Sequence, residues 1–162
     1  MAATESRQEG GCLCGETRFE VVGSPMIVHA CHCTRCQLRF GTAFAVNLWI
    51  EESRVNVLSG QAVKHGDVTS EEGQTSEGWG CACCGFGIWN VIHAAPKGSL
   101  FLRAGNLDDP SAFPPDVHIF TRSKQPWFEI PDNVPSYDAF YDFRDVWSAE
   151  SQQRFKALRE AT

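Results

Sequence analysis

Eight cysteines, all between positions 12 and 84 of a 162-residue chain, constrain the fold of this protein more than any other feature. They form three groups, at positions 12–14, 31–36 and 81–84. A disulfide-stapled secreted domain would be shorter and would carry an export signal, and the first eleven residues contain no apolar segment. Clustered thiols in a reducing compartment more often bind a metal ion. We therefore expect a cytoplasmic metal-binding protein, with disulfides or ordinary core thiols as the alternative.

Length and composition favour one globular domain. Hydrophobic residues make up 43% of the chain and charged residues 21%, which is close to the globular average. We expect a flexible N-terminus over residues 1–10 and a single zinc-binding domain over 11–162. The net charge of −6 argues against nucleic acid or an anionic membrane as partner, and no apolar run approaches the length of a membrane helix. Small molecules are the expected partners.

The pattern of residues predicts an all-β fold in which zinc staples the sheets together. Strands are expected at 16–22, 42–50, 54–58, 61–65, 86–92, 100–103 and 117–122, with a loop inside 66–78. The segment 61–65 is expected to return as the hairpin partner of 54–58. Six of the eight prolines fall at or after Pro110 among many aromatic residues, so long aromatic loops should cover the β core. A short C-terminal helix over about 149–160 should begin after Ser148 as N-cap.

The cysteine spacing predicts two metal sites of different kinds. Cys81 and Cys84 have the C-x-x-C spacing of a metal-binding turn, and Gly85 supplies the left-handed conformation that closes it. Paired with Cys12 and Cys14, they make a closed four-thiolate structural zinc site. A second set offers three thiolates and one open position, which is the pattern of a functional zinc. That set consists of Cys31, Cys33 and Cys36.

An alternative for the second set is another structural zinc, completed by a histidine. His29, His65, His93 and His118 could each reach it through the fold. His32 lies inside the set, but the alternation of an extended chain turns its side chain away from those of Cys31 and Cys33. Cys83 belongs to neither set, and we expect it to be a small buried thiol.

Several motifs resemble the glutathione-dependent formaldehyde-activating enzyme family, which includes centromere protein V domains. They are GGCLCGE, CHCTRCQLRFGTAF, GCACCGFGIW, AGNLDDP, HIF and KQPW, and the resemblance covers about residues 11–137. It implies a β-tent architecture, a structural zinc on Cys12, Cys14, Cys81 and Cys84, and a second, functional zinc on Cys31, Cys33 and Cys36. The sequence departs from the family at Gln37, where a basic residue is common and Arg39 follows two positions later, and at the added Cys83.

The resemblance further implies a carbon–sulfur lyase that joins glutathione or a similar thiol to formaldehyde or another small aldehyde. Zinc would supply the thiolate or polarise the aldehyde. Glutathione is anionic, so the candidate substrate-binding residues are Arg35 and Arg39 beside the second set, with Arg122 and Lys124 further along the chain. His32 and His118 are the candidates for a general base. Trp127 and Phe128 are candidates for the wall of the site.

Two other functions fit the same motifs. One is a non-enzymatic, zinc-stabilised binding module of the centromere-protein or chaperone-like kind. The other is a different redox or lyase enzyme on the same scaffold. A methionine sulfoxide reductase would need a catalytic cysteine after the last group, and no cysteine follows Cys84.

Overall fold

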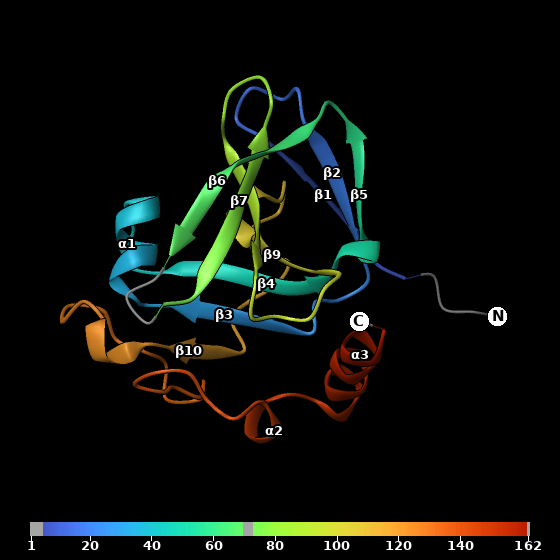
Figure 1. Ribbon diagram of the computed structural model, residues 1–162. Helices are drawn as coiled ribbons and strands as arrows, with labels where there is room; N and C mark the ends of the chain where they lie inside the picture. The colour runs from blue at the N-terminus through green and yellow to red at the C-terminus, as the bar shows by residue number, and fades with distance from the viewer. Residues whose placement is uncertain (1–4, 70–72, 162) are drawn as a thin grey trace.

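The computed structural model of the protein describes residues 5–69 and 73–161. Within them the chain forms two β-sheets and three α-helices, which confirms the predicted mostly-β class with a short C-terminal helix (Figure 1). The smaller sheet has the antiparallel order β1-β2-β5, with strands at Arg7–Gly11, Arg18–Val22 and Val55–Ser59.

The larger sheet contains seven of the described strands in the order β10-β3-β4-β9-β8-β7-β6. Only the β10–β3 pair is parallel. Taken along the chain, these strands are β3 (Ile27–Cys31), β4 (Ala45–Glu51), β6 (Ala62–Thr69), β7 (Thr75–Cys81), β8 (Gly87–Ile92), β9 (Ser99–Arg103) and β10 (Val117–Ile119).

The central strands of this sheet are buried on both faces. Leu48 and Leu102 lie opposite one another on β4 and β9 and pack with Phe19 of the small sheet in a first core. Their neighbours Trp49 and Phe101 point to the other face and belong to a second core. Because successive side chains of a strand alternate between faces, one continuous apolar sequence supplies both cores.

The second face is covered by the C-terminal segment, which crosses beneath β3 and β10 in Figure 1. It carries η3 (Thr121–Ser123), α2 (Phe143–Val146) and α3 (Ala149–Glu160). Ser148 caps α3 as predicted, since its hydroxyl accepts the Ser151 N–H. Arg154 of α3 donates to both carboxylate oxygens of Glu51, at 2.7 and 2.6 Å.

A buried hydrogen-bond chain also fixes this cover. The Tyr141 hydroxyl lies 2.7 Å from His29 Nε2 on β3, and Trp147 Nε1 donates to the same hydroxyl at 2.8 Å. Burial lowers the pKa of His29 to about 3, so the ring is neutral and accepts the hydroxyl proton. These hydrogen bonds thus tie the C-terminal segment to β3 of the large sheet.

Three predictions about local structure differ from the fold. The N-terminus is not flexible as far as residue 10, because β1 begins at Arg7, while residues 1–4 lie outside the described residues. This edge strand pairs through its backbone, and a side chain at Gly10 would stand 2.4 Å from the Asn106 carbonyl oxygen. That close approach requires glycine at position 10.

The second difference is the pairing of two strands. β5 pairs with β2, and β6 pairs with β7, so the predicted hairpin between 54–58 and 61–65 is wrong. The chain turns at Gly60 with φ of 67° and passes from the small sheet to the large one. The third difference is α1 (Thr34–Phe40), a helix that begins inside the second cysteine group and was not predicted. None of the helices in the described ranges has the length and apolarity to cross a membrane.

Candidate metal centres

The first cysteine group brings together two turns that are far apart in sequence. Cys12 Sγ lies 3.4 Å from Cys14 Sγ, and Cys14 Sγ lies 3.8 Å from Cys81 Sγ. Cys84 completes a group whose four sulfur atoms all lie within 4.8 Å of one another. A disulfide needs a sulfur–sulfur distance of about 2.05 Å, and all these cysteines are free.

These separations fit a tetrahedral zinc ion. Zinc–sulfur bonds of about 2.3 Å place neighbouring sulfur atoms about 3.8 Å apart. Backbone N–H groups also point at the sulfur atoms, from Thr17 to Cys12 at 3.2 Å and from Cys83 to Cys81 at 3.4 Å. Such bonds favour the thiolate over the thiol. The first group can therefore hold a zinc ion with protein ligands alone.

A glycine in the left-handed conformation follows each of the two turns. Gly15 has φ of 78° and donates to the Cys12 carbonyl, and Gly85 has φ of 73° and donates to the Cys81 carbonyl. A side chain at either glycine would meet no atom within 4 Å, so the requirement is conformational. Cys83 lies exposed in the second turn and outside the group, so the expectation of a buried thiol is wrong.

The second group forms where β3 runs into α1. Cys31 ends β3, Cys33 is the N-cap of α1, and Cys36 lies in its first turn. Cys31 Sγ and Cys33 Sγ are 3.5 Å apart, and the Cys33 thiol accepts the Cys36 N–H at 3.4 Å. The three sulfur atoms lie within 4.8 Å of one another.

This second group has three donors where the first has four. Among residues 5–69 and 73–161, no further histidine, cysteine, aspartate or glutamate joins it. The pKa of Cys31 is raised by its hydrogen bonds with Cys33 and Cys36 and by burial. The pKa of Cys33 is lowered by its hydrogen bonds with Cys31 and Cys36. A cation is needed for all three to ionise together. The donor set fits zinc with one position left for another ligand.

Two arginines provide the positive charge around this group. Arg103 of β9 stacks on the Phe40 ring, with its guanidinium carbon 4.4 Å from the ring centre. Arg39 lies against the same ring at 5.6 Å. Arg35 donates to the Thr69 carbonyl at 2.8 Å. The sequence prediction thus included Arg39 and Arg35 but missed Arg103.

His32 and His118 face each other and not the thiols. Their Nε2 and Nδ1 atoms are 2.8 Å apart, in contact with the rings of Phe44 and Phe128. Burial, together with nearby His118 and Lys124, lowers the pKa of His32 to about 4, and burial lowers the pKa of His118. Both rings are therefore neutral at pH 7. A role for either one in proton transfer stays a prediction.

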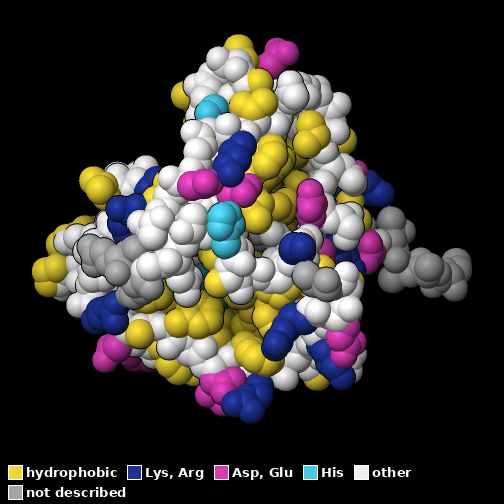
Figure 2. Space-filling view, viewed as in Figure 1, with side chains coloured by type: hydrophobic (Ala, Val, Ile, Leu, Met, Phe, Trp, Pro, Cys, Tyr) yellow, Lys and Arg dark blue, Asp and Glu magenta, His cyan; other side chains and the backbone are white. Residues whose placement is uncertain are grey.

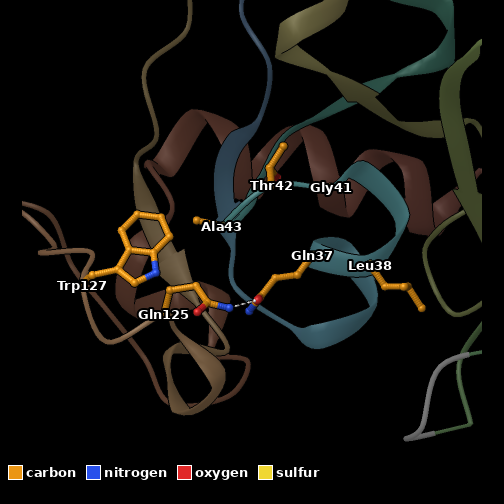
Figure 3. Close-up of a pocket in the computed structure, with 7 residues that line it drawn as sticks. All are labelled: Gln37, Leu38, Gly41, Thr42, Ala43, Gln125 and Trp127. Atoms are coloured by element: carbon orange, nitrogen blue, oxygen red, sulfur yellow. Dashed lines mark hydrogen bonds between the residues drawn. The ribbon is translucent and has the colours of Figure 1, made fainter.

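A pocket of about 440 Å³ lies on the neighbouring face of α1 (Figure 3). Gln37 forms its floor, and Trp127 and Leu38 stand at opposite sides, with 70% and 81% of their surfaces exposed. The Gln37 amide donates to the carbonyls of His32 and Ser123 and accepts a bond from Gln125 at 2.5 Å. This residue, where a basic side chain was expected, joins α1 to the segment after β10.

Other predicted residues have supporting roles in the structure. Lys124 donates to the Phe128 carbonyl at 2.5 Å, and Arg122 lies 5.6 Å from the centre of the Phe120 ring. A third group of possible ligands consists of Asp67 on β6, Glu77 on β7 and His93 just after β8. The face shown in Figure 2 carries basic, acidic and histidine side chains close together near its centre. Lys64 already pairs with both carboxylates, at 2.8 and 3.1 Å, and His93 Nε2 lies 3.2 Å from Glu77, so these side chains have partners without a metal.

Comparison with protein families matches residues 7–123 to the family described as glutathione-dependent formaldehyde-activating enzyme. Among solved structures, one match is the crystal structure of a Rhodobacter sphaeroides protein, a structural genomics target. It is 19% identical, with a TM-score of 0.45, and the alignment covers 62% of this chain and 87% of that one. Comparison with curated proteins found no match. The segment matched by the family contains all eight cysteines.

Proposed function

This chain belongs to the glutathione-dependent formaldehyde-activating enzyme family, and from that premise we propose that it joins a thiol to formaldehyde at its three-thiol group. Family membership supports a formaldehyde-activating, glutathione-related function. The proposal adds the site, formed by Cys31, Cys33 and Cys36, and the reaction class, a carbon–sulfur lyase acting in the direction of synthesis. Another small aldehyde could replace formaldehyde. A cytoplasmic setting, where reduced thiols are abundant, belongs to the same proposal.

One observation carries the proposal: the second group offers three sulfur donors, whereas the first offers four. A site closed by four protein ligands stabilises structure, whereas a site with three leaves a position for a reactant. We propose two zinc ions per chain, a structural one on Cys12, Cys14, Cys81 and Cys84 and a functional one on the second group. Zinc bound at the second group would supply Lewis acidity, which lowers the pKa of a thiol and polarises a carbonyl.

The reaction itself needs no oxidant. The thiol sulfur forms a bond to the aldehyde carbon, the carbonyl π electrons move to oxygen, and that oxygen gains the thiol proton. A free thiol has a pKa of about 8.5 and is mostly protonated at pH 7, so a site that favours the thiolate speeds bond formation. In this proposal the three cysteines hold the metal and do not attack the aldehyde.

The pocket beside α1 has room for the body of a thiol such as glutathione. Gln37 and Leu38 of α1, the helix that carries Cys36, line this pocket, whereas none of the three cysteines lines it. Arg39 and Arg35 remain the proposed contacts for substrate carboxylates, and electrostatic attraction from Cys36 acts on Arg39.

Exchange spectroscopy tests the proposed function. Nuclear magnetic resonance would measure interconversion of glutathione and S-(hydroxymethyl)glutathione with formaldehyde, with and without the zinc-loaded protein. We expect the protein to accelerate exchange above the spontaneous rate, Cys33→Ser to lose that acceleration, and Cys83→Ser to keep it. If the zinc-loaded protein gave no acceleration, the zinc-stabilised binding module would become the better description.

A further inference from the structure

Arg103 is unusual among the arginines of this protein because of what surrounds it. Several other arginines pair with carboxylates, as Arg18 does with Asp108 and Arg154 with Glu51. In the described part of the chain, neither Arg103 nor Arg39 forms an ion pair with a carboxylate. Two neighbouring cations without an acidic partner are unfavourable unless another anion lies close by.

The fold shows which anion that is. Cys36 and Phe40 are four residues apart on α1 and therefore lie on the same side of the helix. Arg103 stacks on Phe40 at 4.4 Å, which places its guanidinium on the side of α1 that carries the Cys36 thiol. Electrostatic attraction from Cys36, Cys31 and Cys33 acts on Arg103 and opposes the lowering of its pKa by burial.

The side chain of Arg103 is also held in place. Arg103 pairs with Asn47 across β9 and β4, and its Nη1 donates to the Asn47 side-chain oxygen. Asn47 is itself buried and pairs with His29 on β3. Arg103, Asn47 and His29 therefore form a row across three adjacent strands, which fixes the position of Arg103. A half-buried guanidinium between an amide oxygen and an aromatic ring is preorganised and loses little entropy when an anion arrives.

We infer that Arg103, supported by Arg39, makes the three-thiol group selective for an anionic fourth ligand, so that the thiol substrate is taken as its thiolate. This inference rests on the proposed function and names a positioning residue for it. Three thiolates and a divalent cation leave one net negative charge, which the two guanidinium groups more than balance. An incoming thiolate neutralises the excess positive charge, whereas a neutral ligand does not.

Ligand binding to the cobalt-loaded full-length protein tests the inference without measuring activity. Cobalt absorption would be titrated with 2-mercaptoethanol, which binds as an anion through sulfur, and with imidazole, which binds neutral. We expect Arg103→Met to weaken 2-mercaptoethanol binding about tenfold, the effect of one partly screened charge, and to change imidazole binding less than twofold. Arg103→Lys should recover most of the loss. Arg39→Met, at an exposed position that tolerates substitution, should give about a threefold loss in the same direction.

Two controls identify the responding site. Cys33→Ser should abolish the spectral response, because the four-thiol group has no open position. Lys156→Met removes an exposed charge on α3 that pairs with Glu160, and it should leave both affinities unchanged. Cobalt content and circular dichroism confirm that each variant is folded and loaded.

Three results would overturn the inference. Equal weakening of 2-mercaptoethanol and imidazole by both Arg103→Met and Arg39→Met would show that the arginines only shape the site. Mercaptoacetate, a thiol that carries a carboxylate, would be titrated in the same way. If Arg103→Met weakened the binding of mercaptoacetate alone, Arg103 would be assigned to the substrate carboxylate. Failure of the wild-type protein to bind 2-mercaptoethanol at all would contradict thiolate capture. Selective thiolate binding without accelerated exchange would instead count against the proposed function alone. Accelerated exchange with unselective binding would count against the inference alone.

Discussion

The two thiol groups lie on opposite faces of the same large sheet. Cys12 and Cys81 belong to the core between the two sheets, whereas the second group belongs to the core beneath the C-terminal segment. The first group joins turns about 70 residues apart in sequence, and the second lies within six residues. A metal ion in the first group therefore links distant parts of the chain, whereas one in the second group links only β3 to α1. A metal ion in the four-thiol group would therefore stabilise the fold, whereas the three-thiol group is positioned by a fold that does not depend on its metal ion.

Removing a ligand from the first group should have the largest effect. We expect Cys81→Ser to leave the chain without a stable fold, because a structural zinc contributes about 10 kcal/mol or more and a domain of this size has only about 5–15 kcal/mol to lose. Thermal melting by circular dichroism, with zinc content measured on the same sample, checks this. Cys83→Ser is the matched control, since this exposed thiol lies outside the group. A wild-type melting curve for Cys81→Ser would end the distinction between the sites.

The same substitution in the second group should be much milder. Cys33→Ser removes one thiolate but keeps a side-chain oxygen to cap α1, since serine is a strong N-cap residue. We expect the folded protein to lose one equivalent of zinc and its melting temperature to fall by about 5 °C, which corresponds to about 1–2 kcal/mol. Metal analysis of the purified variant is the measurement. Retention of both zinc equivalents would mean that the second group is closed by a ligand other than Cys33.

The cover over the second group can be loosened without touching a thiol. Tyr141→Phe removes the hydroxyl shared by His29 and Trp147 and leaves both buried nitrogen atoms without a partner. We expect a loss of about 1–3 kcal/mol in the free energy of unfolding, measured with urea, at unchanged zinc content. Tyr137→Phe is the control, because the Tyr137 ring lies 5.2 Å from that of Tyr141 and its hydroxyl makes no hydrogen bond within the described ranges. Similar losses for the two variants would show that the hydroxyl bridge is not the source of stability.

The smallest effect is expected from substituting one glycine beside each thiol group. Gly85 closes the turn of the first group and Gly41 is the C-cap of α1, with φ of 73° and 62°. Neither position would bring a side chain within 4 Å of another atom, so Gly85→Ala and Gly41→Ala should each cost about 1 kcal/mol through backbone strain alone. Urea unfolding measures both, and Gly105→Ala, at an open position with ordinary φ, should change stability by only a few tenths of a kcal/mol. A much larger cost at Gly85 than at Gly41 would show that strain reaches the first metal site.

Sequence spacing predicts local thiol chemistry better than it predicts strand pairing. The grouping of Cys81 with Cys84 and the left-handed Gly85 follow from a few neighbouring residues, and the structure places them as expected. The pairing of β5 with β2 depends on which sheet accepts the chain after Gly60, and this is decided by core packing between distant segments. Propensity alone could not show it.

The same reasoning explains the residues that sequence analysis missed. Arg103 stands 67 positions after Cys36, and only the β4–β9 register and the Phe40 ring bring it to that side of α1. The available signal was the strand itself, because Arg103 is the single charged residue of β9, whose sequence is SLFLR. Helix α1 was hidden because its seven residues begin only three positions after the end of β3 and overlap the C-x-x-C spacing of Cys33 and Cys36.

The separation of Cys12 from Cys81 also bears on the order in which the two thiol groups could take up metal ions during synthesis. Cys12 and Cys14 leave the ribosome long before their partners exist, while the second group is complete as soon as residue 36 has emerged. Closing a short loop costs less entropy than closing a long one. A nascent chain would therefore expose its complete three-thiol group to zinc first. Cys12 and Cys14 would be competing ligands until residues 81–84 have been synthesised.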